Sequence, residues 1–509
     1  MKQFVILALA LFSLQSLVAR EIDLFDVETT YQAANILQPW RKYNKTQPVL
    51  GVPFAGRYVI TILPYGDGRS ALVKPVGGTR RDVASLIKLD SELRLAILRV
   101  GDLKESNDPA NPLIPQRFFG NDLPPMFLDL KALPLKSALR TSGPGQIGHT
   151  VFYEGTGASL SPAGNTEVPV IRFSGFQKNI SPGHVLTHDG ALVGLIASFD
   201  VSTGLGTAIP AALIEQFLAA SGFDKNNALK IEPPAAEPDI FGPDKEGTIV
   251  RTAGFRGRAQ SEPSFLRYQG LISERPAIAV VQTVYVRTQE RTLLQNDLIL
   301  NVPGNDISAR GSVNDEYYGE LPLSLALVLK NGRFTTETSV TISVLRDREK
   351  REIRQPVLAA SESMNVVPER FRTPSYLIAG GLVFLELSAE ALPKMGTPPS
   401  RLAFIRDRYL QSDNLSGERV VFVNEVLPLD QNAGYANGRR ILTAVNGIGI
   451  RNLNHAHSLV KDARRRGTDV VFTFEGNEIM VFSAERLAQA DEMLRKKYSI
   501  PFLSGAPPE

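Results

Sequence analysis

The chain of 509 residues contains no cysteine, one tryptophan and five histidines. Without cysteine it can have no disulfide framework, no lipid-modified N-terminal cysteine and no Cys/His zinc site. The histidines show no HExxH or comparable ligand spacing, so the sequence predicts no metal site and no cofactor. The formal net charge is only +3, and no long basic run is present, which argues against a nucleic-acid partner.

Long apolar runs are also scarce. The one at the N-terminus reads FVILALALFSLQSLVA and is preceded by Lys2. A charged start before a short apolar core is typical of a secretory signal peptide, here residues 1–19 with Ala19 as the last residue before cleavage. No second run of this kind occurs. We therefore expect export across the inner membrane to the periplasm, with no integral membrane segment after signal cleavage.

The length predicts three or four domains, and the composition is that of an ordinary globular chain. Residues 20–48 are expected to form an N-terminal lead-in with a short helix around Ala33 to Trp40. From Val49 the sequence changes to short β-rich runs separated by turns, which predicts barrels or sandwiches, and a helix over 210–220 closes this unit. A Pro/Gly/charge-rich segment at 223–262 indicates an interdomain linker.

The most informative stretch is Asn179 to Ile196, NISPGHVLTHDGALVGLI, in which a Pro-Gly corner precedes an Asp-Gly hairpin turn and an apolar strand. This outline resembles the nucleophile loop of trypsin-like proteases of the Deg/HtrA (protease Do) family. The N-S-G-G-P segment of that loop is missing here. Further likenesses lie at Tyr58–Thr61, Leu95–Val100 and Gly206–Pro210. The resemblance implies a trypsin-like double β-barrel over residues 49–222.

Carried over residue by residue, the resemblance leaves no catalytic residue. Pro64 falls on the base histidine, Arg94 on the orienting aspartate, and Val185 lies nearest to the nucleophile. A triad acts as a unit, and loss of its serine or histidine alone costs about 10⁶ in rate in a well-studied protease. A cation beside an imidazole also disfavours the imidazolium formed during proton transfer. Replacement chemistry would have to come from neighbours that lack a G-x-S-x-G elbow, namely Ser174, Ser181, His184 and His188.

Two further units, at 263–360 and at 361–509 with a C-terminal helix, repeat one order of glycine loop, strand, helix and hairpin. In the second, PSYLIAGGLVF and the segments after it resemble the last domain of plant-organelle-type Deg proteases. The resemblance implies PDZ-like domains, in which an extended peptide or C-terminus pairs with the strand after the glycine loop. The expected peptide-binding residues are Tyr268, Gln269, Gly270, Leu271, Leu325 and Leu329 in the first unit, and Gly380, Gly381, Leu382, Val383, His455 and Leu459 in the second.

For the first unit we also expect Tyr268 to Leu271 to open a strand and residues 322–330 to form a helix. An alternative remains for both units: the glycine loops are only turns, and the grooves are filled by the protein's own chain.

The fold class expected from the sequence is mainly β, with a trypsin-like double β-barrel followed by two PDZ-like α+β domains. The functional hypothesis is a catalytically inactive Deg/HtrA-like pseudoprotease that binds unfolded or C-terminal polypeptide segments as an adaptor or holdase in protein quality control. One alternative is an active serine endopeptidase. Another is a structural subunit that assembles with catalytic paralogues. The resemblance implies a homo-oligomer, alone or mixed with active paralogues.

Overall fold

The structure is a computed structural model. It describes residues 24–54, 58–63, 70–75, 81–90, 92–101, 130, 133–143, 146–160, 167–175, 180, 182–226, 230–232, 246–271, 277–283, 292–294, 296–301, 307–308, 310–360, 375–387, 391–395, 402, 419–435, 438–500 and 502–505. The predicted signal peptide at 1–19 lies outside these residues. No helix within them is long and apolar enough to cross a membrane.

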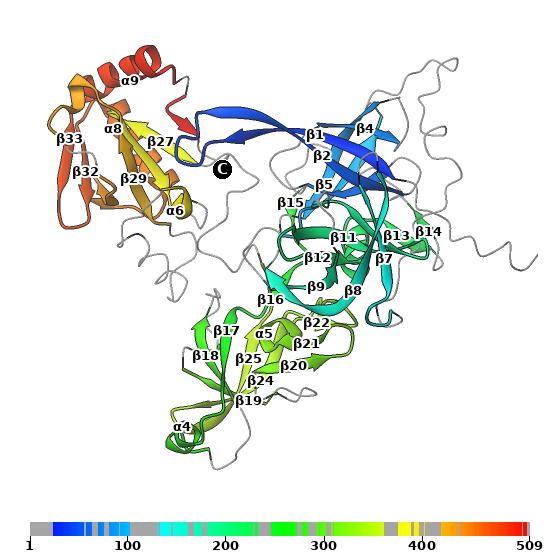
Figure 1. Ribbon diagram of the computed structural model, residues 1–509. Coiled ribbons are helices and arrows are strands. Elements are labelled where there is room, and N and C mark those ends of the chain that lie inside the picture. The colour runs from blue at the N-terminus through cyan, green and yellow to red at the C-terminus, as the bar shows by residue number, and fades with distance from the viewer. Residues whose placement is uncertain are drawn as a thin grey trace, which may run out of the picture.

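Six strands near the N-terminus close into a barrel (Figure 1). They are β1 (Phe25–Ala34), β2 (Lys42–Phe54), β3 (Tyr58–Ile62), β4 (Ser70–Pro75), β5 (Asp82–Asp90) and β6 (Leu95–Val100). Their order around the barrel is β1-β2-β3-β6-β5-β4, and pairing of β4 with β1 closes the ring. Every residue of β3 and β6 is buried. Burial on both faces explains why these two strands are apolar in the sequence at every position except Thr61 and Arg99.

A second closed barrel follows. Its strands are β7 (Ala138–Gly143), β8 (Gln146–Leu160), β9 (Glu167–Ser174), β10 (Val185–His188), β11 (Ala191–Asp200) and β12 (Leu205–Pro210). The strand order around this barrel is β7-β8-β9-β12-β11-β10. If the six strands of each barrel are numbered in chain order, both barrels have the same order, 1-2-3-6-5-4. Helix α3 (Ala211–Ala220) closes the unit. The repeated path confirms the predicted trypsin-like double barrel.

The two barrels share one apolar core at their interface. Ile60 and Ile97 of the first barrel belong to the same buried cluster as Val193 and Ile209 of the second. The chain after α3 returns to the first barrel, where the ring of Phe223 packs edge-on against Phe54 and Tyr58 at centroid distances of 5.0 and 4.9 Å. The closing helix is thereby fixed to both barrels.

The predicted lead-in is instead part of the first barrel. Residues 25–34 form β1, and β1 pairs with β2 from Phe25 opposite Gly51 to Ala34 opposite Lys42. The predicted helix around Ala33 to Trp40 is wrong, because this segment is the end of β1 and the turn that follows it. Cross-strand pairing overrides the local helix preference of the two alanines.

The first PDZ-like unit has a five-stranded sheet in the order β17-β18-β19-β24-β25. These strands are β17 (Phe255–Gln260), β18 (Ala277–Thr283), β19 (Leu298–Asn301), β24 (Ser339–Arg346) and β25 (Glu349–Pro356). The helices are α4 (Pro263–Tyr268) and α5 (Leu323–Ala326). Short pairs complete the unit: β16 (Arg251–Thr252) with β26 (Leu358–Ala359), β20 (Ser312–Asp315) with β21 (Gly319–Pro322), and β22 (Leu329–Lys330) with β23 (Arg333–Phe334).

This unit begins inside the segment predicted as a linker, because β17 starts at Phe255. The earlier part of that segment contains a hairpin of β13 (Asp224–Asn226) with β14 (Lys230–Glu232), and β15 (Glu246–Gly247), which pairs in parallel with β5. The side-chain amide of Gln216 in α3 exchanges hydrogen bonds of 2.8 and 2.9 Å with the backbone of Phe334. The unit is therefore anchored to both barrels.

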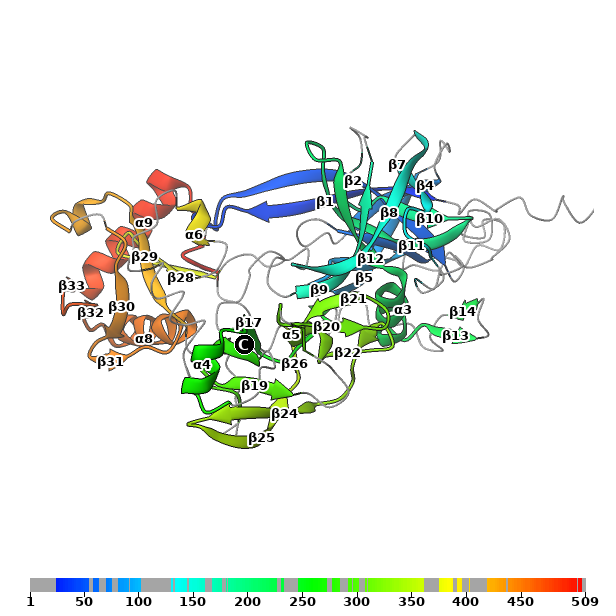
Figure 2. The same ribbon diagram turned by 60° about the horizontal axis from the view of Figure 1, so that its bottom comes forward.

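The C-terminal unit contains a sheet in the order β33-β32-β30-β29-β28-β27-β34, with β31 paired to β30 (Figure 2). Its strands are β27 (Tyr376–Ala379), β28 (Leu382–Glu386), β29 (Val421–Val426), β30 (Ile441–Val445), β31 (Ile448–Gly449), β32 (Val470–Phe474), β33 (Ile479–Phe482) and β34 (Ser504–Gly505). Its helical elements are α6 (Ala391–Lys394), the short η4 (Asp430–Asn432), α8 (Leu453–Arg466) and α9 (Ala484–Tyr498). The buried α8 side chains and Leu487 of α9 belong to one apolar cluster, and Ala490 and Leu494 of α9 belong to a second cluster on the other face of the sheet.

Candidate functional site

The three segments that carry the predicted catalytic positions meet at the seam between the barrels. The N–H of Leu63, directly after β3, donates to the carbonyl of Arg94 in the turn before β6 at 2.9 Å. A Cβ placed on Gly183, just before β10, would lie 3.1 Å from the Cβ of Val49 and 3.5 Å from the carbonyl oxygen of Ile62. The end of β3, the turn before β6 and the entry to β10 therefore converge, as the predicted arrangement requires.

The described side chains at two of these predicted positions are those of Arg94 and Val185. Arg94 occupies the position predicted for the orienting aspartate and has a left-handed backbone, with φ of 57°. Val185 is the first residue of β10 and is fully buried. Pro64 lies outside the described residues. Neither Arg94 nor Val185 provides the carboxylate or hydroxyl that acyl transfer needs at its position.

The backbone before β10 is paired with the neighbouring strand. The N–H of Gly183 donates to the carbonyl of Ile196 at 2.8 Å, and the N–H of Ile196 donates to the carbonyl of His184 at 2.8 Å. An oxyanion hole needs N–H groups aimed at the open position where negative charge develops. Because the N–H of Gly183 is already bound to β11, it cannot play that part.

The neighbouring histidines and serines are held in local contacts. His184 is buried, and burial lowers its pKa to about 4, so the imidazole is neutral at pH 7 and is a weak base. The Nδ1 of His188 lies 2.9 Å from the carbonyl oxygen of Ala138. Ser174 donates its hydroxyl hydrogen bond to the carboxylate of Glu154. Ser181 lies outside the described residues.

In the first PDZ-like unit, the predicted glycine loop is a helix end. Tyr268 is the last residue of α4, and the guanidinium of Arg348 lies over its exposed ring, 5.2 Å from the centroid. Gln269 ends the helix, and Gly270 follows with φ of 90°. The prediction that this segment opens a strand is wrong, because a glutamate N-cap and a proline at the first helical position start a helix before it.

The other residues predicted for this site lie elsewhere. Leu271 packs with a small cluster of leucines around α4, whereas Leu325 belongs to the core shared with the barrels. The helix predicted over 322–330 is wrong beyond Ala326. Leu329 begins a hairpin whose turn, Asn331 and Gly332, has positive φ at both positions. Leu329 and Lys330 are extended because they pair with Phe334 and Arg333 across this turn, so the helix cannot include them.

Strand β17 is the edge strand of this unit's sheet, and the chain enters it through Gly254, with φ of 70°. An edge strand is the part of a sheet to which an extended peptide can add. The hydroxyl oxygen of Thr252 accepts from the N–H of Gly254 at 3.0 Å, and the carbonyl of Ala253 accepts from the amide of Gln355 at 2.7 Å. Sequence reasoning missed this loop, although the run AGFRG at 253–257, placed just before α4, could have indicated it.

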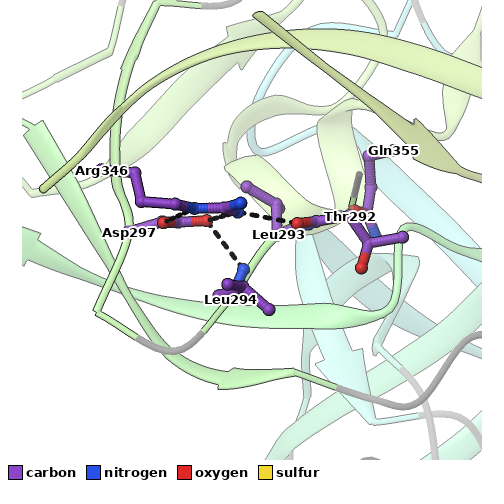
Figure 3. A network of polar contacts seen from close by, with 6 residues as sticks. All are labelled: Thr292, Leu293, Leu294, Asp297, Arg346 and Gln355. Carbon is purple, nitrogen blue, oxygen red and sulfur yellow. Dashed lines mark hydrogen bonds and ion pairs between the residues drawn. The ribbon is translucent and has the colours of Figure 1, made fainter. Parts of the chain in front are cut away.

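Gln355 connects this loop to a buried polar network (Figure 3). Its side-chain oxygen accepts from the N–H of Leu293 at 3.0 Å. Next to it, the guanidinium of Arg346 forms two hydrogen bonds of 2.7 and 2.6 Å with Asp297 and a third of 2.8 Å with the carbonyl of Thr292. The backbone around the proposed peptide loop is therefore held by side chains rather than by strand pairing alone.

In the C-terminal unit, Gly380 and Gly381 form the turn of a hairpin, with φ of 61° and 86°. Strand β28 pairs with β27 on one side and with β29 on the other. Leu382 and Val383 are fully buried. An added peptide strand would therefore find no open edge along β28.

The glycine turn of this unit is occupied by the protein's own side chain. The amide of Asn432 donates to the carbonyls of Gly380 and Leu427 at 2.9 and 2.8 Å. A Cβ on Gly381 would lie 2.3 Å from the same amide nitrogen, so only glycine fits there. His455 and Leu459 are half-buried on α8, beside a turn that is already filled. Asn432 therefore fills the glycine turn of this unit.

No group of three or more His, Asp or Glu side chains within the described ranges is arranged to hold a metal ion. Fold and site together define the class: a trypsin-like double barrel followed by two PDZ-like units. Its seam brings together the end of β3, the turn that contains Arg94 and the entry to β10 just before Val185.

Comparison with known proteins identifies the C-terminal unit directly, because residues 367–504 match the PDZ domain family. This segment is a PDZ domain. Two solved structures of HtrA-type protease AlgW are similar to the chain at 18% sequence identity. The complex with a decapeptide has a TM-score of 0.40 and covers 67% of this chain and 97% of that one. The complex with a tripeptide has a TM-score of 0.41 and covers 67% and 95%. No curated protein matches the chain.

Proposed function

We propose that this protein is exported to the periplasm and binds unfolded or C-terminal polypeptide segments without cleaving them, as an adaptor or holdase in protein quality control. The observation that carries this proposal is the closed loop before β10. There the N–H of Gly183 is bound to Ile196, and the buried Val185 lies nearest to the nucleophile position. A seam without a free N–H at Gly183 and without a hydroxyl at Val185 is expected to leave a bound peptide intact.

The proposed peptide site is the outer edge of β17. Gly257 and Arg258 are exposed, and α5 lies alongside the strand. Farther along, the edge is covered, because a Cβ on Gly311 would lie 3.1 Å from the Cβ of Ala259. An extended peptide would therefore add to the first part of β17, beside the bend at Gly254. Backbone pairing of this kind gives affinity with little dependence on sequence.

The PDZ domain at 367–504 has a different part in this proposal. Its glycine turn is filled by Asn432, and β28 is paired on both sides. We propose that this domain has a structural role in the chain and does not bind polypeptide ligands. The first unit then acts as the receptor, and the second as a structural domain.

Peptide titration of matched glycine variants tests the site. A fluorescent C-terminal peptide should bind the full chain saturably. Gly254→Ala should weaken binding about tenfold, because a Cβ disfavours the left-handed bend by about 1–2 kcal/mol. Gly270→Ala is the control: Gly270 also has a positive φ, of 90°, but a Cβ there meets nothing nearer than 3.8 Å. It should bind like the wild type.

Two results would contradict the proposal. Equal affinities for wild type and Gly254→Ala, at matched melting temperatures, would show that the peptide does not bind at β17. Recovery of cleaved peptide, measured by mass spectrometry at the end of the titration, would show that the seam is catalytic.

A further inference from the structure

The first two strands extend beyond the barrel as an arm. Strand β4 pairs with β1 only from Phe25 to Thr30, whereas the pairing of β1 with β2 continues to Ala34 opposite Lys42. Residues 31–45 thus form a two-stranded ribbon with its turn, and this ribbon reaches the PDZ domain in both views (Figures 1 and 2). Because an isolated two-stranded ribbon is marginal in water, its tip needs a partner.

The tip of the arm, residues 35–41, is a shaped turn. The side-chain oxygen of Asn35 accepts from the N–H groups of Leu37 and Gln38 at 3.0 and 3.2 Å. The N–H of Asn35 donates to the carbonyl of Arg41 at 2.9 Å and closes the turn. The Asn35 bonds follow the pattern by which asparagine fixes local turns. The tip therefore presents a defined surface rather than a set of independent side chains.

Polar contacts set the position of this tip on the PDZ domain. The amide of Gln38 donates to both carboxylate oxygens of Glu425 at 3.0 and 3.3 Å. The amide of Asn424, a largely buried side chain, donates to the carbonyl of Leu37 at 3.0 Å. Bonds to a charged group and to a buried amide fix position more firmly than exposed contacts do.

Apolar contacts accompany them. The ring of Trp40 lies 5.8 Å from that of Tyr376, and Ile36 and Leu37 pack on the same cluster. This cluster contains Ala490 and Leu494 of α9, whereas the α8 side chains belong to the cluster on the other face of the sheet. The contact is therefore separate from the groove between β28 and α8 that PDZ peptides use.

We propose that the α9 face of the PDZ domain is a binding site whose ligand is the arm tip of the same chain. The site recognises a β-turn that presents a backbone carbonyl, a primary amide and an indole, through Asn424, Glu425 and Tyr376. This proposal is independent of peptide binding at β17. In this proposal the arm holds the PDZ domain against the first barrel. Strand β2 of the arm also contains Val49, which lies beside Gly183.

Tryptophan fluorescence of the full chain tests docking, because Trp40 is its only tryptophan. Glu425→Arg should shift the emission to longer wavelength and increase acrylamide quenching severalfold. Glu492→Arg, the same charge change at an exposed position of α9, is the matched control and should leave both unchanged. Identical emission for wild type and Glu425→Arg would overturn the proposal.

Cross-linking decides whether the ligand is the same chain. The absence of native cysteine allows Gln38→Cys and Glu425→Cys to be combined and joined by a short bis-maleimide. We expect a monomeric product with the two positions linked, at a yield independent of protein concentration. Each single variant should give no such link. A dimeric product whose yield rises with concentration, or no cross-link while circular dichroism shows a folded chain, would contradict the proposal.

Discussion

Asp297→Ala is expected to lower the free energy of unfolding by about 3–5 kcal/mol, the usual cost of removing one partner of a buried ion pair. The Asp297 side chain is 2% exposed and that of Arg346 is 16% exposed. Asp297 also accepts from the N–H of Leu294 at 2.7 Å. The variant would leave a largely buried guanidinium without its counterion and that N–H without its acceptor. The hydrogen bond to Asp297 raises the pKa of Arg346, which keeps the guanidinium charged.

Urea unfolding of the full chain, monitored through a signal that reports on the first PDZ-like unit, measures this effect. The double variant Asp297→Leu with Arg346→Met should recover much of the loss, because no unpaired charge remains. Glu337→Ala is the surface control. Glu337 pairs with Lys330, and both side chains are more than half exposed, so its loss should cost about 0.5 kcal/mol or less. A cost for Asp297→Ala as small as that of Glu337→Ala would show that the pair does not hold the unit.

Asp90→Asn is expected to lower the free energy of unfolding by about 1–3 kcal/mol at pH 8 by opening the connection between the first barrel and the chain that enters the first PDZ-like unit. Buried Asp90 accepts from the N–H of Leu93 at 2.8 Å on its own turn. Across the connection it accepts from the N–H of Ile249 at 2.8 Å and the hydroxyl of Thr248 at 3.0 Å. An asparagine amide can replace one acceptor oxygen but turns an NH₂ toward another donor.

The same variant has a predicted pH dependence. Burial raises the pKa of Asp90 to about 6, from 3.8. The folded chain therefore binds a proton that the unfolded chain does not bind between these values. The resulting stabilisation is fully present below pH 3.8 and is lost as the pH rises through 6. Destabilisation by Asp90→Asn should thus be greater at pH 4 than at pH 8, by about 2 kcal/mol. A difference independent of pH would contradict the raised pKa.

The double barrel could be predicted because its signals are local. Strands β3 and β6 are apolar runs interrupted only by Thr61 and Arg99, and Pro210 marks the start of α3. The arm could not be predicted in this way. Its tip is stabilised by Asn424 and Glu425, almost 400 residues later in the chain. No pattern within residues 20–48 contains that information, so the segment was predicted to be a lead-in.

The peptide-binding sites show a similar division. The order of strand, helix and hairpin was sufficient to predict two PDZ-like units. Which glycine bends into the proposed peptide-binding strand, β17, depends on contacts that the sequence does not show, such as the hydrogen bond from Gln355 to the carbonyl of Ala253. The filled turn of the C-terminal unit depends on Asn432, which lies 52 residues after Gly380. Gly270 looked like a loop glycine because its helix is short and its sequence lacks an amphipathic pattern.

Intact mass measurement of the mature chain after treatment with excess fluorophosphonate probe tests the central claim most directly, with an active trypsin-like protease as the positive control. We expect the mass to stay unchanged while the control is fully labelled, because the seam has Val185 nearest to the nucleophile position and the N–H of Gly183 bound to β11. Stoichiometric labelling of any serine would contradict the account.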